Sequence, residues 1–159
     1  MPQPDTLVTG GAGFLGSALV RRLVQEGRRV RVMDDASRGR LSRIADLSGQ
    51  IELINGDVRN AEAVAAACSG IESVFHLAAV NGTEFFYSRP EVVLDVGVGG
   101  MLNVVRACVA KGVRGLYVTS SSEVYQTPLR VPTAEVVPLV IPDPLNPRYS
   151  YAGSKIISE

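Results

Sequence analysis

The chain has 159 residues, of which 46% are hydrophobic and 20% charged, a composition typical of one folded domain with its own core. Sixteen basic side chains balance sixteen acidic ones, which argues against nucleic acid or an anionic membrane surface as a partner. No apolar run is judged long enough to span a membrane, no secretory leader is visible, and the two cysteines lack metal-ligand spacing. We therefore expect a cytoplasmic protein of one domain, residues 1–159, with no metal site and no membrane partner.

A glycine-rich segment follows the first apolar stretch, Thr6–Thr9, and precedes a helical pattern that begins at Phe14. Its glycines fit G-x-G-x-x-G as Gly11, Gly13 and Gly16, or G-x-x-G-x-x-G as Gly10, Gly13 and Gly16. In either pattern the glycines permit a tight turn, approach of a diphosphate to the backbone, and close packing of the helix. The free N–H groups at the helix N-terminus favour phosphate. The segment predicts dinucleotide binding by Gly10, Gly13, Phe14, Leu15 and Gly16.

The second predicted strand begins at Val30 and ends at Asp34. A carboxylate at this point of a dinucleotide fold binds the adenosine ribose hydroxyls, and its charge repels a 2′-phosphate. Asp34 therefore favours NAD over NADP. Three arginines that could accept such a phosphate follow closely and leave the preference open: Arg38, Arg40 and Arg43.

Strands and helices alternate along the rest of the chain. We expect strands at Ile51–Ile54, Val74–Ala78 and Leu116–Val118, helices at Ala61–Cys68 and Glu91–Lys111, and a loop at Asn81–Pro90. This alternation predicts an α/β fold, a Rossmann-type doubly wound parallel sheet with helices on both faces.

Glycine, histidine and cysteine residues inside these elements are interpreted from their surroundings in the sequence. Glycines at 97, 99 and 100 weaken the long helix, so we expect a close approach there to a ligand or to another helix. His76 is flanked by apolar residues and is interpreted as a satisfied core histidine rather than a catalytic one. Cys68 and Cys108 are expected to be reduced thiols packed on helix faces.

Six of the nine prolines fall between Pro128 and Pro147, which predicts an extended active-site loop at about residues 124–148. The helix after it carries Tyr151 and Lys155, four residues apart and so on one face. A phenol that acts as base near neutral pH needs its pKa lowered from about 10, at a cost of about 4 kcal/mol. One ammonium at ~5 Å supplies about 3 kcal/mol, so an oxidised nicotinamide would have to supply the rest.

The segments TGGAGFLG, GDVRN, HLAA, SSSEVY and YAGSK, together with Asp34, resemble the extended short-chain dehydrogenase/reductases, and within them the NAD-dependent sugar-nucleotide epimerase/dehydratase family. The resemblance implies that Tyr151 is the base, that Lys155 lowers its pKa and holds the nicotinamide ribose, and that Ser121 binds the sugar hydroxyl. Glu123 is either a working glutamate, as in the decarboxylases and dehydratases of this family, or a structural acid. Further NAD contacts are implied for Asp57, Val58, Leu77, Ala78 and Ala79.

By the same resemblance the cofactor is NAD and the partner a nucleotide sugar, with a UDP-sugar favoured. The complete enzyme is expected to be a homodimer joined through the long helix and the Tyr/Lys helix. Gly97 stands where the family usually has Asn, which removes an active-site hydrogen bond. The family continues past the Tyr/Lys helix, so we expect the C-terminal strands and the substrate lobe to be absent from residues 1–159, and this chain to bind NAD without turnover.

The predicted reaction is hydride transfer between a sugar carbon and NAD with Tyr base catalysis, through a keto-sugar. An alternative is a dinucleotide-binding module without turnover, structural or regulatory. Retention of Ser121, Tyr151 and Lys155 together favours the enzyme, because a pure binding module has no need of them.

Overall fold

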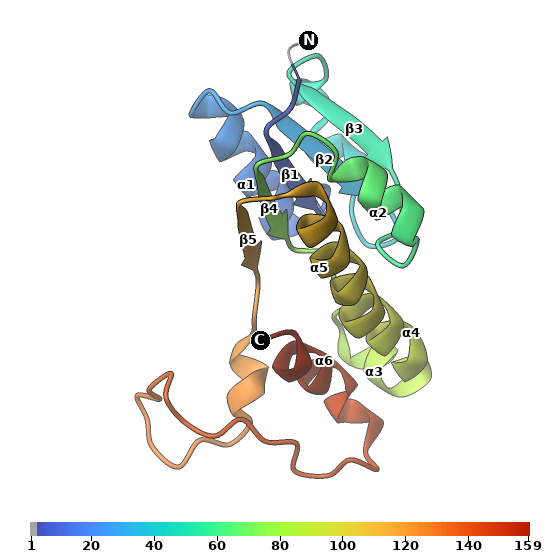
Figure 1. Ribbon diagram of the computed structural model, residues 1–159. Helices are drawn as coiled ribbons and strands as arrows, with labels where there is room; N and C mark the ends of the chain where they lie inside the picture. The colour runs from blue at the N-terminus through green and yellow to red at the C-terminus, as the bar shows by residue number, and fades with distance from the viewer. Residues whose placement is uncertain (1–2) are drawn as a thin grey trace.

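The computed structural model describes residues 3–159 and contains one parallel sheet with the strand order β3-β2-β1-β4-β5 (Figure 1). The strands are β1 (Thr6–Thr9), β2 (Val30–Asp34), β3 (Ile51–Asn55), β4 (Ser73–His76) and β5 (Gly115–Val118). The central position of β1 puts its glycine-rich turn between the segments that follow β2 and β4. The predicted Rossmann-type sheet is confirmed.

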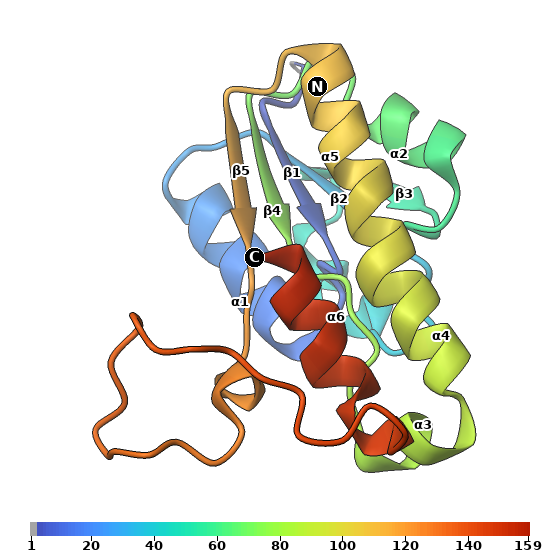
Figure 2. The ribbon, with the colours of Figure 1, turned by 60° about the horizontal axis from the view of Figure 1, so that its bottom comes forward.

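Helices cover both faces of this sheet, with α1 on one face and α2 and α5 on the other (Figure 2). The α-helices are α1 (Phe14–Gln25), α2 (Ala61–Ala67), α3 (Thr83–Ser88), α4 (Pro90–Leu94), α5 (Gly100–Lys111) and α6 (Ser150–Ser158). Short 3₁₀ turns lie at η1 (Leu41–Arg43), η2 (Ala45–Leu47), η4 (Ser122–Tyr125) and η5 (Pro147–Tyr149), and a π-helical segment at η3 (Asp95–Gly99). The helix α6 lies beyond the carboxyl ends of the strands, where ligands bind in such folds.

Two hydrophobic clusters fill the spaces between the sheet and its helices. The α5 cluster includes Val104 and Ala107 of α5, and the α1 cluster includes Val20 and Leu23 of α1. Consecutive residues of β1 point to opposite faces of the sheet, so the fully buried Leu7 belongs to the α5 cluster and the fully buried Val8 to the α1 cluster. Cys68 and Cys108 are free thiols buried in the α5 cluster, as expected. Burial raises the pKa of both thiols, that of Cys68 to about 12, so neither is a reactive thiolate.

The segment Asn81–Pro90 was expected to be a loop, and this prediction is wrong. It contains the helix α3, Thr83–Ser88, because Phe86 is buried to 2% exposure in the α5 cluster. Pro90 then occupies the first turn of α4, where its missing N–H costs nothing. Tertiary burial of one aromatic side chain thus outweighs the loop-like local sequence.

The predicted long helix is continuous but changes geometry at η3. A Cβ atom on Gly97 would lie 2.6 Å from the Ser154 hydroxyl of α6, and one on Gly100 would lie 2.6 Å from Val58. The expected close approach to another helix is confirmed at Gly97, whereas Gly100 packs against Val58 of the turn after β3. Gly99 has nothing within 4 Å of its Cβ direction and has no such role.

By length and composition, one helix of the described chain could cross a membrane. Residues Pro90–Lys111 form 22 helical residues with a mean hydropathy of 1.7, so the expectation that no apolar run is long enough is wrong. Its inner side packs in the α5 cluster through Val93, Val96, Val104 and Ala107. We interpret it as the partly buried core helix of the domain.

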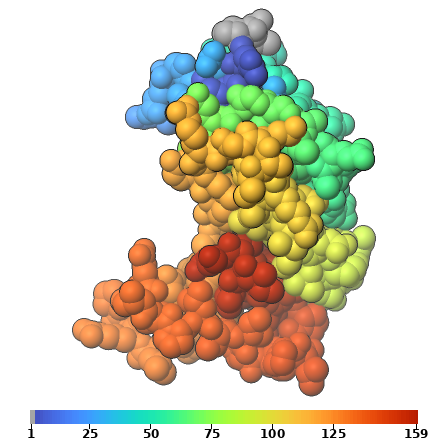
Figure 3. Space-filling model, viewed as in Figure 1, coloured from blue at the N-terminus to red at the C-terminus, as the bar shows by residue number. Residues whose placement is uncertain are grey.

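The predicted loop region lies between η4 and η5, and within the described chain it has no helix or strand from 126 to 146. In Figure 3 this segment stands away from the body of the molecule, beyond α6. Several of its apolar side chains are exposed: Leu129, Val131, Val136, Val140 and Leu145. The segment joins η4 to η5, and η5 leads directly into α6.

Candidate functional site

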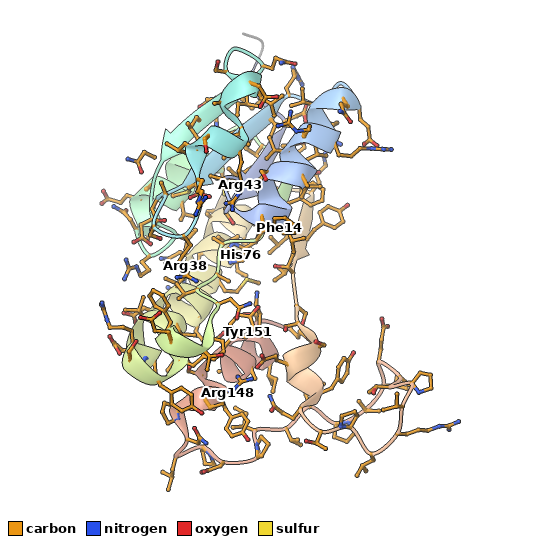
Figure 4. All side chains as sticks on the ribbon, turned by 180° about the vertical axis from the view of Figure 1, so that it is seen from behind. Phe14, Arg38, Arg43, His76, Arg148 and Tyr151 are labelled. Carbon is orange, nitrogen blue, oxygen red and sulfur yellow. The ribbon has the colours of Figure 1, made fainter. Side chains whose placement is uncertain are left out.

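A pocket of about 540 Å³ opens at the carboxyl ends of the strands, within the size range of small-ligand sites. Figure 4 shows three of its side chains: Phe14 from α1, Arg38 from the segment after β2, and Tyr151 from α6. Every residue predicted to contact NAD lines it: Gly10, Gly13, Phe14, Leu15, Gly16, Asp34, Asp57, Val58, Leu77, Ala78, Ala79, Tyr151 and Lys155. The chain thus brings the glycine turn and the Tyr/Lys pair to one cavity.

The glycine turn fits a diphosphate in the pattern Gly10, Gly13, Gly16. Gly10 has a φ of 71°, and a Cβ on it would lie 2.8 Å from the backbone nitrogen of Ala78. A Cβ on Gly16 would overlap the Gly10 carbonyl oxygen, which shows how closely α1 packs on the turn. Gly11 instead faces Val32 in the core and does not line the pocket. The structure therefore favours the G-x-x-G-x-x-G pattern.

The N-terminus of α1 opens toward this turn. Gly13 is its N-cap, and the first N–H that bonds back into the helix is that of Ser17, to the Gly13 carbonyl at 3.0 Å. The preceding N–H groups of Phe14, Leu15 and Gly16 therefore remain available to phosphate oxygens. A dinucleotide diphosphate fits this cradle.

Asp34 lies at the carboxyl end of β2 and is 8% exposed. Its Oδ2 accepts the N–H of Ala12 and its Oδ1 the N–H of Ala36, each at 2.8 Å. These bonds fix the carboxylate and leave lone pairs for ribose hydroxyls. Asp57 lines the same pocket, and hydrogen bonds from the Arg59 side chain lower the pKa of its carboxyl.

Tyr151 and Lys155 lie on one face of α6, with the Lys155 Nζ 5.8 Å from the centre of the Tyr151 ring. Nζ donates to the Thr119 carbonyl oxygen at 2.6 Å, which holds the ammonium under the pocket. Burial raises the pKa of Tyr151, against a lowering effect of the Ser121 hydroxyl, and burial lowers the pKa of Lys155. In the protein alone the phenol is thus harder to ionise than in water, so a base role needs added positive charge beside it.

Sequence reasoning missed Phe86, which packs on Tyr151, and Arg148, which packs on Phe86. The Phe86 ring stacks on the Tyr151 ring, with 5.4 Å between centroids and 16° between planes, and the Arg148 guanidinium lies 5.1 Å from the Phe86 centroid. The paired phenylalanines at 85 and 86 were the available signal, because adjacent aromatic residues are unusual in a solvated loop.

Glu123 forms a bidentate ion pair with Arg148, at 2.8 and 3.1 Å. The hydrogen bonds to Glu123 raise the pKa of the guanidinium, and the pair joins the two ends of the 126–146 segment. Ser121 caps η4 by accepting the Glu123 N–H at 3.2 Å. Neither Ser121 nor Glu123 lines the pocket of the glycine turn. The ion pair supports the structural interpretation of Glu123 over the catalytic one.

His76 is a satisfied core histidine, as the sequence predicted. Its Nδ1 lies 2.8 Å from the Thr9 hydroxyl, and the side chain is buried in β4. Burial, and secondarily the charge of Lys155, lowers its pKa from 6.5 to about 4.

We expect this histidine to make the fold sensitive to mild acid. Between pH 6.5 and about 4 the unfolded chain binds a proton at His76 that the folded chain does not, so stability is lost as the pH falls through this window. A shift of this size corresponds to about 3 kcal/mol. Urea unfolding at pH 7, 5.5 and 4.5 measures it. His76→Asn, which can keep the bond to Thr9 but does not titrate, should flatten the dependence, and an unchanged slope would contradict the assignment.

A model of the NAD dependent epimerase/dehydratase family matches residues 6–159. The UDP-glucose 4-epimerase of Mycolicibacterium smegmatis is 36% identical over 158 residues, which cover 97% of this chain and 49% of the relative. The human 3 beta-hydroxysteroid dehydrogenase type 7 is 40% identical over 121 residues, covering 74% of this chain and 32% of that protein. The chain thus spans about half the length, or less, of these curated relatives.

Among solved structures, the dTDP-glucose 4,6-dehydratase of Streptomyces venezuelae, determined with NAD bound, superposes with a TM-score of 0.86 at 29% identity. The match covers 97% of this chain and 49% of the dehydratase chain. The family is NAD-dependent, in agreement with the glycine cradle and the fixed carboxylate of Asp34. The chain belongs to the NAD-dependent epimerase/dehydratase family.

Proposed function

We propose that this chain is the NAD-binding part of a sugar-nucleotide epimerase/dehydratase that oxidises a sugar hydroxyl to a keto-sugar intermediate. The observation that carries the proposal is that Tyr151 and Lys155 line the same pocket as the glycine turn. Bound NAD⁺ would accept the hydride from the sugar carbon. The relatives named for UDP-glucose and dTDP-glucose support a nucleotide sugar as substrate, with a UDP-sugar favoured.

In this reaction the protein's own side chains accept a proton and place a positive charge beside the base. Tyr151 takes the proton of the sugar hydroxyl as the hydride leaves the same carbon, so the electron pair of the broken O–H bond forms the new C=O bond. Lys155, fixed on the Thr119 carbonyl, supplies one positive charge beneath the phenol. Ser121, at the N-cap of η4, would orient the sugar hydroxyl, and its own hydroxyl lowers the pKa of Tyr151.

A hydroxysteroid is the second candidate substrate, because a relative named as a 3 beta-hydroxysteroid dehydrogenase is 40% identical over three quarters of this chain. Oxidation of a secondary alcohol is the chemistry common to both substrates. To separate them, the complete gene product is incubated with NAD⁺ and UDP-, dTDP- and GDP-sugars or a 3β-hydroxysteroid. Reduced cofactor is followed by absorbance and new products by chromatography. We expect conversion of a UDP-sugar; NAD binding with conversion of no substrate would favour a non-catalytic module.

The same proposal includes a homodimer of the complete enzyme, joined through the long helix that α4 and α5 form and through the Tyr/Lys helix α6. Exposed apolar side chains recur there at helical spacing: Leu94, Leu102, Val105 and Val109. We expect light scattering of the complete gene product to show a dimer, and Leu102→Glu to shift it to monomer because a charge would be buried in the interface. Leu53→Glu is the control, since Leu53 is also 46% exposed but lies on β3 at the sheet edge. A wild-type monomer, or a Leu102→Glu dimer, would contradict this interface.

A further inference from the structure

The pocket has an unfavourable charge balance for a dinucleotide. Three carboxylates line it, those of Asp34, Asp35 and Asp57, against two cations among the described lining residues, Arg38 and Lys155. Lys155 donates a hydrogen bond to the Thr119 carbonyl oxygen, at the end of the pocket where Tyr151 lies. A diphosphate adds two negative charges, and Arg38 is the lining cation that is not held at the Tyr151 end of the pocket.

Arg38 spans the two segments on either side of the glycine turn. It belongs to the segment after β2, and its Nη2 donates to the carbonyl oxygen of Asn81, after β4, at 2.7 Å. Its guanidinium carbon also lies 4.4 Å from the centre of the Phe85 ring. Because β1 lies between β2 and β4 in the sheet, this bridge runs past the end of β1, where the glycine turn begins. The arginine is thus held at the mouth of the phosphate cradle.

The surroundings leave the guanidinium room and free donors. A Cβ atom on Gly82, whose φ is 129°, would lie 3.3 Å from Nη2, so the glycine keeps this space open. A guanidinium has five N–H donors, and the bond to Asn81 uses one. Arg38 can therefore bind phosphate oxygens while it keeps its place on Phe85.

The neighbouring arginines do not share this position. The Arg43 guanidinium donates to the Ala12 carbonyl at 3.1 Å, and neither Arg43 nor Arg40 lines the pocket. We propose that Arg38 binds the diphosphate of the dinucleotide and closes the pocket over it, rather than binding the 2′-phosphate of NADP. This inference rests on the proposed NAD binding of the same pocket.

The test is calorimetric titration of NAD, NADP and adenosine into wild type, Arg38→Ala and Arg40→Ala at low ionic strength. Loss of a charge-assisted hydrogen bond to phosphate should weaken NAD about ten- to 100-fold in Arg38→Ala, and NADP by the same factor. Adenosine, which lacks phosphate, should bind both proteins alike. The salt dependence of NAD binding should fall in Arg38→Ala. Arg40→Ala, a control with the same charge change in the same segment, should bind NAD as wild type does.

Each other outcome overturns the inference in a distinguishable way. A loss confined to NADP would make Arg38 a 2′-phosphate site, and an equal loss for adenosine would make it a structural bridge only. Unchanged NAD affinity in Arg38→Ala, with wild type binding NAD, would reject the diphosphate role while leaving the proposed function intact. Failure of wild type to bind NAD would reject both. Thermal unfolding without ligand shows whether Arg38→Ala is folded.

Discussion

We expect Gly16→Ala to lose NAD binding together with much of its stability. The added Cβ would overlap the Gly10 carbonyl oxygen and lie 2.9 Å from the Gly10 carbonyl carbon and the Gly11 Cα. These are backbone atoms, so relief requires α1 to move away from β1, and the loss in the free energy of unfolding should be about 3 kcal/mol, the upper end of the usual range for overpacking. Urea unfolding measures the stability, and calorimetry measures the binding.

Substitutions at two other glycines distinguish an effect on the free energy of unfolding from an effect on NAD affinity. A Cβ on Gly13 meets only the Gly10 carbonyl oxygen, at 3.0 Å, so Gly13→Val should fold and yet fail to bind NAD, because its branched side chain occupies the diphosphate space. Gly99 is helical with nothing within 4 Å, so Gly99→Ala should be more stable by about 0.5–1 kcal/mol and bind normally. Wild-type stability of Gly16→Ala would show that α1 does not pack on the turn as described.

Local sequence patterns predicted the sheet, and they predicted the glycine turn and Asp34 as a candidate site for NAD. The alternation of strands with helices predicts the parallel sheet, and the fold itself then brings the strand ends, and with them Gly10, Asp34 and Ala78, to one cavity. Family resemblance added Asp57, Val58, Leu77, Ala78 and Ala79, which line the same pocket. The sequence could not decide between G-x-G-x-x-G and G-x-x-G-x-x-G, because that choice depends on Gly11 facing Val32 in the core.

What the sequence could not predict depends on pairs of residues far apart in the chain. The helix α3 forms because Phe86 is buried against Tyr151, 65 positions later. The ion pair between Glu123 and Arg148 likewise exists only once η4 and η5 are folded beside each other. Local pattern and propensity carry no information on such contacts, which is also why Arg38 could not be told from its neighbours.

The largest effect on catalysis is expected from Tyr151→Phe, which removes the proposed base. The phenylalanine keeps the stack on Phe86, so NAD affinity and stability should be close to those of wild type, while turnover of the complete gene product should fall about 10²- to 10⁴-fold. Tyr125→Phe is the control, since that phenol belongs to η4 and does not line the pocket. Substantial turnover by Tyr151→Phe would exclude the phenol as base.

The pH dependence gives a second, independent check of this role. Burial raises the pKa of Tyr151 in the protein alone, so ionisation near neutral pH must come from positive charge beside the ring. Lys155, whose Nζ lies 5.8 Å from the ring centre, is the positive charge that the chain itself places there. Activity should therefore rise with pH as the phenol ionises, and Lys155→Met should move this rise to higher pH.

Titration of ¹³C-labelled tyrosine should also show a lower Tyr151 pKa with NAD⁺ than with NADH, because only the oxidised nicotinamide is positively charged. Equal pKa values in the two complexes would mean that the cofactor does not lie beside this phenol.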